Sequence, residues 1–333
     1  MDGVQRKDAK RNVSGVLLLD KPSRISSNQA LQIVKRLFAA RKAGHTGTLD
    51  PMATGLLPIC LGEATKFSSA LLSADKRYEA TLMLGYTSTT GDAEGEISIA
   101  CEGPWRDGRD MHLEPSRIGS VLKSFTGAIT QTPPMYSAIK VRGKPLYAYA
   151  REGVELQRKP REIYIYDLRM LSLARNEMRI AVKCSSGTYI RTLGEDIGIA
   201  LGCGGGYLTA LRRVGTDDFD ISQSHALSEL EEMPLSQRDA CLLPADGLLH
   251  HYPAVTLDHA SVEAVLHGQR IKTGFYGAAP GPWEDTGCAR GFADFGEGEK
   301  LRLYDAENRF LGLGEITPEM ELAPVRLTVA TAL

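Results

Sequence analysis

The chain has 333 residues and a mass of 36.2 kDa, with 43% hydrophobic and 24% charged residues and a formal net charge of −2. This ordinary globular composition excludes a disordered chain, and the near-neutral charge excludes a uniformly basic nucleic-acid binder. The segment MDGVQRKDAKRN lacks the apolar core of a signal peptide, and no window reaches the ~18 apolar residues of a membrane span. We therefore expect a cytoplasmic protein with no membrane partner.

The N-terminal part of the chain predicts a strand, a helix and a loop. The run GVLLLDKP at 15–22 is typical of a buried strand that enters a turn at its proline. A helix capped by one of residues 26–28 is expected next, because apolar residues recur at helical spacing until about residues 41–42. The glycines and the proline of GHTGTLDPMATGLL, residues 44–57, predict a rigid loop.

Strands and helices continue to alternate in the middle of the chain. Strict alternation of apolar residues in RYEATLMLGY predicts a strand at 77–86 with one buried face. A capped helix is expected at 114–127, and a hairpin at 163–184 that turns at 175–177. The segment SSGTYIRT then leads into a short helix that ends near Gly202.

From about residue 250 the pattern changes to short strand-like runs with glycine-containing turns and one helix-like piece, HASVEAVLHG. We interpret this part as a small β-barrel-like domain. The predicted organisation is a charged tail at 1–13, a large domain at 14–249 and the small domain at 250–333. The stretch 277–298, rich in Gly, Pro and acids, predicts a long loop.

Charge and cysteine placement narrow the chemistry. Residues 140–161 hold seven Lys or Arg against two Glu, whereas residues 284–307 hold seven acids against three bases. Taken alone, the basic run is most simply a solvated face. The six cysteines have no Cys-x-x-Cys spacing and the histidines no metal-binding spacing, so we expect reduced thiols and no bound metal.

One acidic residue, Asp50, sits among small, apolar and turn-forming neighbours in the loop 44–57. Such surroundings raise the pKa of a carboxyl group and make its charge costly unless a cation lies opposite. For an arbitrary Leu-Asp-Pro triplet, a turn or cap aspartate is the ordinary interpretation.

Five blocks occur in order along the chain: GVLLLDKP, GHTGTLDPMATGLLPICLGEATKF, DKRYEATLMLGYTSTTGDAEG, QTPPMYSAIKVRGKPLYAYAREG and CSSGTYIRTLGEDIGIALGCGG. Together they resemble the bacterial TruB-type tRNA pseudouridine-55 synthases. A single short motif arises by chance, but five ordered blocks across residues 14–245 hardly do. The C-terminal part resembles the PUA-type RNA-binding domain of the same enzymes.

The resemblance implies an α/β (α+β type) pseudouridine-synthase fold, with a mixed, mainly antiparallel sheet flanked by helices. It also implies that a uridine at position 55, in the T loop of tRNA, is isomerised to pseudouridine. This reaction breaks the N1–C1′ bond and joins C5 to C1′ without redox change, so no cofactor is expected. Asp50 would be the essential catalytic residue, either adding to C1′ or removing a proton from C2′, and the sequence leaves both routes open.

By the same resemblance, Arg191 would be the cation beside Asp50, and Tyr78 and Tyr189 would frame a flipped-out uridine. Tyr78 would stack on the base, and its hydroxyl is a candidate for removing the C5 proton. Leu211 would line the uridine pocket. Without the family, Tyr78 and Leu211 would both be interpreted as core residues.

The remaining implied contacts concern RNA. His45 would fill the gap left by the flipped base, although a His after Gly in a tight loop is usually an ordinary polar residue. Lys21, the basic run and Arg212–Arg213 would contact phosphates. Arg24 stands where the family commonly has glycine, which predicts either a different backbone angle or a phosphate contact.

We therefore expect a monomeric tRNA-modifying isomerase that acts on the T arm. One rival is an RNA-binding chaperone or scaffold that keeps the fold without catalysis. A second rival is a nucleoside glycosidase, which would release free uracil.

Overall fold

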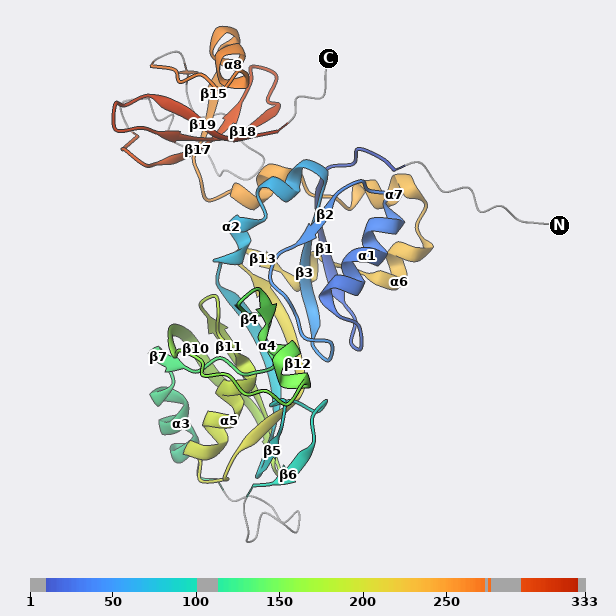
Figure 1. Ribbon diagram of the computed structural model, residues 1–333, viewed down its shortest axis with the longest axis vertical. Coiled ribbons are helices and arrows are strands. Elements are labelled where there is room, and N and C mark those ends of the chain that lie inside the picture. The colour runs from blue at the N-terminus through green and yellow to red at the C-terminus, as the bar shows by residue number, and fades with distance from the viewer. Residues whose placement is uncertain (1–9, 101–112, 273–274, 277–294, 329–333) are drawn as a thin grey trace, which may run out of the picture.

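The computed structural model describes residues 10–100, 113–272, 275–276 and 295–328. Figure 1 shows an elongated molecule, with a small unit at one end and a long sheet that carries helices at its middle and far end. Within the described residues, no helix is both long enough and apolar enough to cross a membrane.

Most strands belong to one ten-stranded sheet, in the order β14-β1-β3-β12-β4-β11-β10-β7, with β2 on β3 and β13 on β12. Only the β1–β14 and β3–β12 pairs are parallel, so the predicted mixed, mainly antiparallel sheet is confirmed. The strands are β1 (Gly15–Lys21), β2 (Ala43–His45), β3 (Thr54–Leu61), β4 (Lys76–Leu84), β7 (Gly127–Gln131), β10 (Arg161–Ala174), β11 (Glu177–Cys184), β12 (Gly206–Thr216), β13 (Phe219–Asp220) and β14 (His225–Ala226).

Helices cover the sheet and join its strands. Figure 1 places α1, α6 and α7 beside β1–β3, and α3 and α5 beside β10 and β11. The larger part contains α1 (Ser27–Leu37), η1 (Gly62–Lys66), α2 (Ser69–Leu72), α3 (Pro115–Ser124), α4 (Leu146–Arg151), α5 (Ile190–Ala200), η3 (Ile221–Gln223), α6 (Leu227–Glu232), α7 (Leu235–Ala240) and η4 (Ala245–Leu249).

The first predicted helix is confirmed, but it is shorter than expected. Ser26 caps α1 through a capping box with Gln29, which satisfies two backbone donors at its start. The helix ends at Leu37 because Ala39 adopts a left-handed φ of 48°, which a continuing α-helix cannot contain.

The predicted loop 44–57 is only partly correct. Residues 43–45 form β2, and β3 begins at Thr54, so the loop proper is 46–53. Gly55 belongs to β3, with a φ of 103°, and a Cβ there would lie 2.2 Å from the carbonyl oxygen of Arg213. Glycine therefore allows β12 to pass close to the end of this loop.

The other predicted elements of the large part match β4, α3, the β10–β11 hairpin and α5. Strand β12, which lies at the centre of the sheet between β3 and β4, was not predicted from the sequence. Its pattern is obscured because Arg213 points inward and is 1% exposed, so a charged residue occupies a core position.

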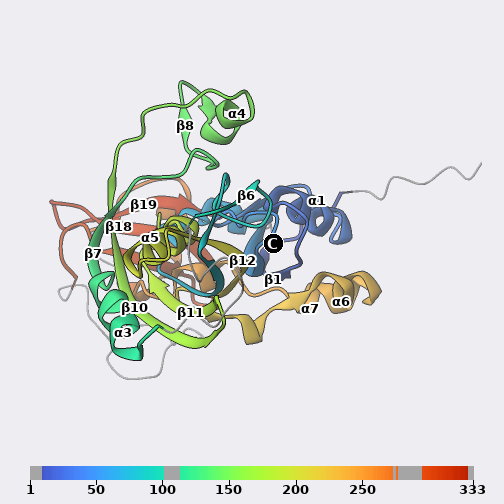
Figure 2. The same cartoon turned by 90° about the horizontal axis from the view of Figure 1, so that it is seen from below.

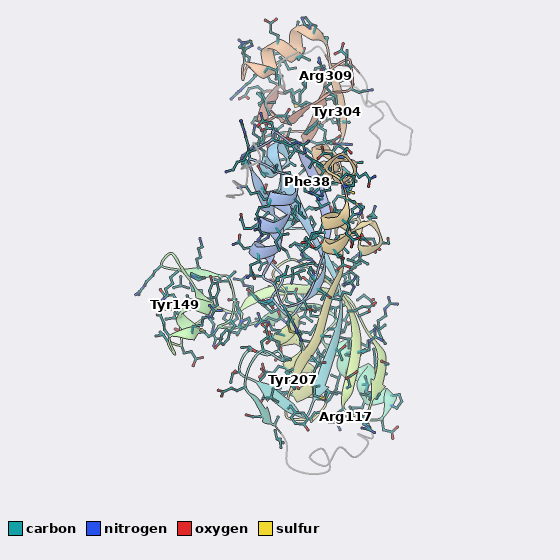
Figure 3. All side chains as sticks on the ribbon, turned by 90° about the vertical axis from the view of Figure 1, so that its right-hand side faces the viewer. Phe38, Arg117, Tyr149, Tyr207, Tyr304 and Arg309 are labelled. Atoms are coloured by element: carbon teal, nitrogen blue, oxygen red, sulfur yellow. The ribbon has the colours of Figure 1, made fainter. Side chains whose placement is uncertain are left out.

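A small basic arm projects from the large part. It consists of β8 (Lys140–Val141), β9 (Lys144–Pro145) and α4, and it contains part of the predicted basic run. Figure 2 shows β8 and α4 standing away from the sheet, and Figure 3 places Tyr149 in this separate lobe. A second small hairpin pairs β5 (Tyr86–Ser88) with β6 (Ile97–Ile99).

The C-terminal part is strand-rich, as predicted. Its five-stranded sheet runs β16-β15-β17-β18-β19, and α8 (His259–Leu266) follows β15. The long loop predicted at 277–298 lies mainly outside the described residues. The strands are β15 (Ala254–Leu257), β16 (Phe275–Tyr276), β17 (Lys300–Tyr304), β18 (Phe310–Ile316) and β19 (Leu322–Leu327).

The two parts share a buried junction. One apolar cluster joins Phe67 and Leu71 of the large part to Leu313 of the small part, with Phe310 packed against it. The rings of Phe67 and Phe310 meet edge to face with centroids 5.4 Å apart. The boundary proposed at residue 250 therefore runs through a shared core, not through an open linker.

Candidate active site

A cavity of about 230 Å³ opens beside the loop 46–53. It is smaller than the ~300–1,000 Å³ typical of pockets for drug-sized ligands, and its size suits a single nucleobase or nucleoside. Five of the predicted site residues line it, from four segments of the chain: Asp50, Tyr78, Tyr189, Arg191 and Leu211.

Hydrogen bonds hold the loop that carries Asp50. The hydroxyl of Ser27 accepts from the backbone N–H of Leu49 at 2.8 Å and donates to the carbonyl of the same residue at 2.9 Å. The backbone N–H of Arg24 donates to the carbonyl of Pro51 at 2.8 Å. Both ends of the Asp50 segment are thus tied to the start of α1, which fixes the carboxylate in place.

Arg24 itself adopts a left-handed φ of 67°, in the region that favours glycine. The turn therefore has a glycine-type backbone angle although its residue is arginine. Arginine in place of the common glycine therefore has not changed the backbone angle of this turn.

The predicted cation does lie opposite Asp50. Nε of Arg191 is 3.0 Å from Oδ2 of Asp50, and the Asp50 side chain keeps 36% of its surface exposed, whereas that of Arg191 keeps 6%. Burial raises the pKa of the Asp50 carboxyl above its ordinary value, and the Arg191 charge acts against that rise. The arginine thus favours the ionised carboxylate in an apolar setting.

Further contacts fix the orientation of Arg191. Its two terminal nitrogens donate to the carbonyls of Thr90 at 2.8 Å and Tyr136 at 2.7 Å. Oδ2 of Asp92, a residue only 2% exposed, lies 3.7 Å from Nη1. Asp92, in the segment TTGDAEG, was not predicted as a site residue, because its neighbours in the sequence do not indicate that it pairs with Arg191.

The two tyrosines occupy different kinds of position. Tyr78 lies on the buried face of β4 with Ala80 and packs against the main core, and it also lines the cavity. Burial raises the pKa of its phenol above the ordinary value. Tyr189 caps α5, and its backbone exchanges hydrogen bonds of 3.0 and 3.3 Å with the Gln131 amide.

The position of Lys21 does not fit the phosphate contact that was predicted for it. It is fully buried, and its ammonium donates to the carbonyls of Pro22 at 2.8 Å, Ile25 at 2.7 Å and Pro51 at 3.4 Å. Burial lowers the pKa of this lysine to about 8. Its amine braces the turn under the Asp50 loop and does not face solvent.

Arg213 is likewise buried, and it donates to the carbonyls of Leu56 at 2.7 Å and Gly47 at 3.1 Å. It cannot make the predicted phosphate contact from this position. Arg212 is more open, with a side chain 40% exposed, and it pairs with Asp20 through two hydrogen bonds of 3.0 and 2.7 Å.

His45 ends β2, and it is not among the described residues that line the cavity. Its Nδ1 is buried without a hydrogen-bond partner in the described structure, and burial lowers the pKa of the ring. The side chains of Asp217, His250 and His251 form a group with metal-ligand spacing, and none of the three is among the described residues that line the cavity. There His250 already contacts Asp218 at 2.9 Å.

Comparison with known proteins decides the family. Residues 35–190 match the TruB family pseudouridylate synthase (N terminal domain). Residues 191–250 match the tRNA pseudouridylate synthase B C-terminal domain, and residues 253–328 match the Pseudouridine synthase II TruB, C-terminal. A tRNA pseudouridine synthase B of Nitrosospira multiformis is 58% identical over 319 residues, 96% of each chain. The chain belongs to the TruB family.

Other TruB relatives and solved structures agree. A tRNA pseudouridine synthase B of Methylobacillus flagellatus is 48% identical over 97% of this chain and 98% of its own length. A Cbf5-Nop10-Gar1 complex contains a chain with a TM-score of 0.64 and 24% identity, covering 95% of this chain and 84% of that one. A chain in the structure of an H/ACA RNP bound to a substrate RNA has a TM-score of 0.65 and 22% sequence identity, covering 100% of this chain and 88% of that one. These two structural likenesses support the fold.

Proposed function

We propose that this protein isomerises a uridine of tRNA to pseudouridine, at position 55 in the T loop, acting as a monomer in the cytoplasm. The observation that carries the proposal is the ion pair between Asp50 and Arg191, 3.0 Å long, at the wall of a cavity of nucleoside size. The names of its close relatives support the tRNA substrate.

The chemistry fits this pair. Breaking the N1–C1′ bond develops positive charge at the sugar, which a neighbouring carboxylate stabilises. The exposed part of the Asp50 side chain can face the sugar, while Arg191, almost wholly buried, keeps the carboxylate ionised. Asp50 then either adds to C1′ or takes the C2′ proton, and both routes regenerate the carboxylate at the end of the cycle.

The cavity wall supplies what a flipped base requires. Tyr78 offers a ring for stacking, and Tyr189 and Leu211 enclose the remaining sides. The Tyr78 hydroxyl lies in the same wall, and we assign it to the C5 proton transfer. The uracil remains enclosed between bond cleavage and recapture, so the reaction needs no water and no redox reagent.

RNA contacts come from surfaces outside the cavity. The basic arm carries Lys140, Arg142 and Arg151 away from the sheet, where phosphates can reach them. The carbonyl of Tyr136, just before the arm, accepts from Arg191, so the arm is joined directly to the catalytic pair. The domains proposed at 14–249 and 250–333 would then divide catalysis from additional RNA binding.

The test is incubation with an unmodified T-arm hairpin, scored for pseudouridine at every position. The proposal expects product at one uridine and no free uracil. Free uracil would favour a glycosidase. Tight hairpin binding without product, for both the wild-type protein and Asp50→Asn, would favour an RNA-binding scaffold and overturn the proposed activity.

A further inference from the structure

Leu72 is an exposed apolar residue at the edge of the catalytic cavity. It ends α2, lines the cavity together with Asp50 and Tyr78, and keeps 51% of its surface exposed. An exposed leucine alone is unremarkable, since folded proteins expose many apolar atoms. What sets Leu72 apart is its continuity with the cavity and the way in which its backbone is held.

The backbone of Leu72 is held by a buried lysine. Lys76, itself 7% exposed, donates through Nζ to the carbonyls of Leu71 at 3.3 Å, Leu72 at 2.9 Å and Ala74. The preceding side chain, Leu71, is fully buried in the junction cluster. Burial lowers the pKa of Lys76 to about 8, which shows the cost of placing an ammonium there. The turn that presents Leu72 is thus rigid.

The occupant of this surface follows from the proposed reaction. When a uridine leaves its stack, each neighbouring base loses a stacking partner on one face. The RNA strand on either side of that uridine must pass the edge of the cavity. Proteins that unstack nucleic acids commonly cover the freed face of a base with an apolar side chain.

We propose that Leu72 packs against the nucleobase adjacent to the flipped-out uridine and so stabilises the extruded state. This inference rests on the proposed function. Leu72 forms its contact only with bound RNA, so the free protein should not depend on it. Covering the exposed half of a leucine corresponds to about a tenfold gain in affinity for the extruded state.

The experiment measures kcat/KM for pseudouridine formation in an unmodified T-arm hairpin. Leu72→Ala should lower kcat/KM about tenfold and leave thermal unfolding unchanged. The matched control is Ile199→Ala, an aliphatic residue on α5 that is 55% exposed and is not among the described residues lining the cavity. The control variant should equal the wild-type protein.

Two further hairpins, with an abasic nucleotide on the 5′ or the 3′ side of the target uridine, identify the contact. With one of them the wild-type protein should lose its tenfold advantage over Leu72→Ala, because the base that Leu72 covers is missing. An advantage that persists with both hairpins, or is absent with the intact one, overturns the inference. If even the wild-type protein forms no pseudouridine, the proposed function fails, and this inference with it.

Discussion

Two buried arginines in this molecule donate hydrogen bonds to similar groups but have different roles. Arg191, 5% exposed, lines the candidate active-site cavity, and Arg302, fully buried, lies at the junction of the two parts. Each donates to a backbone carbonyl, Arg191 to Thr90 and Arg302 to Tyr252 at 2.7 Å. Each is also linked to a carboxylate: Arg191 contacts Asp50 directly, whereas Arg302 donates at 3.4 Å to the Tyr304 hydroxyl, which in turn donates to Asp246.

The difference lies in the access to the carboxylate. Asp50 keeps about a third of its side chain open to the cavity, whereas Asp246 is 4% exposed and accepts a 2.6 Å hydrogen bond from the Tyr304 hydroxyl. Figure 3 shows Tyr304 close to the end of the molecule that carries the small part, far from Tyr207 in the sheet. A buried charge network is structural when it is closed and becomes chemically useful when one acceptor stays open.

The most severe test of this comparison is Asp50→Asn. We expect pseudouridine formation to fall about 10³-fold or more, because the amide can neither attack nor accept a proton. Thermal unfolding should be unchanged, since Arg191 keeps its two carbonyl partners and the nearby Asp92 carboxylate, and Asp50 is partly exposed. Single-turnover product formation and melting curves measure both. Asp167→Asn, at an exposed carboxylate, is the control.

Replacing Arg191 by Gln should shift the pH dependence. In the proposed mechanism catalysis needs the ionised Asp50, whose pKa burial raises and the Arg191 charge lowers. Removing that charge raises the pKa of Asp50 further, so the acid limb of the pH–activity profile should move to higher pH. The loss is about tenfold for each unit by which the pKa exceeds the assay pH. A pH profile of kcat/KM with an unmoved acid limb would contradict the role given to Arg191.

At the closed network, Tyr304→Phe should affect stability and not chemistry. Asp246 would lose the donor that its buried carboxylate accepts from, which costs about 1.5–3 kcal/mol of unfolding free energy. Denaturant unfolding measures this loss. Activity per folded molecule on a T-arm hairpin should stay at the wild-type value, and a fall there would mean that the junction takes part in catalysis.

The smallest effect is expected at an open surface pair. Arg212→Met removes the pairing with Asp20, which is partly exposed and therefore stabilises by no more than about 1 kcal/mol. If Arg212 contacts phosphate, as the sequence analysis predicted, tRNA affinity should fall and the slope of log K against log salt should decrease by about 1. An unchanged slope assigns Arg212 to structure alone.

Local patterns predicted much of the fold. The capping residues of α1, the alternation in β4 and the turn between β10 and β11 are properties of short segments, and all three elements formed as expected. The central strand β12 was missed because Arg213 occupies a core position. The carbonyls of Gly47 and Leu56, far away in the sequence, accept its hydrogen bonds and make that position acceptable for an arginine.

The candidate site likewise contains residues that could be predicted from the sequence and residues that could not. The need of Asp50 for a cation followed from its apolar neighbours, and family resemblance supplied Arg191 as that cation. The family resemblance assigned Lys21 to phosphate contact, whereas its ammonium is in fact buried and donates to three backbone carbonyls. Asp92 was missed because its contact with Arg191 exists only after folding brings the two segments together.

The shared core at the junction has a practical consequence for truncated proteins. A fragment ending near residue 250 would lack Phe310 and Leu313, and the apolar surface around Phe67 and Leu71 would be left facing water. Such fragments are prone to self-association during expression. A truncated enzyme could then lose activity because it aggregates, even if its affinity for tRNA were unchanged. Point substitutions on the outer surface of the small unit separate these two effects.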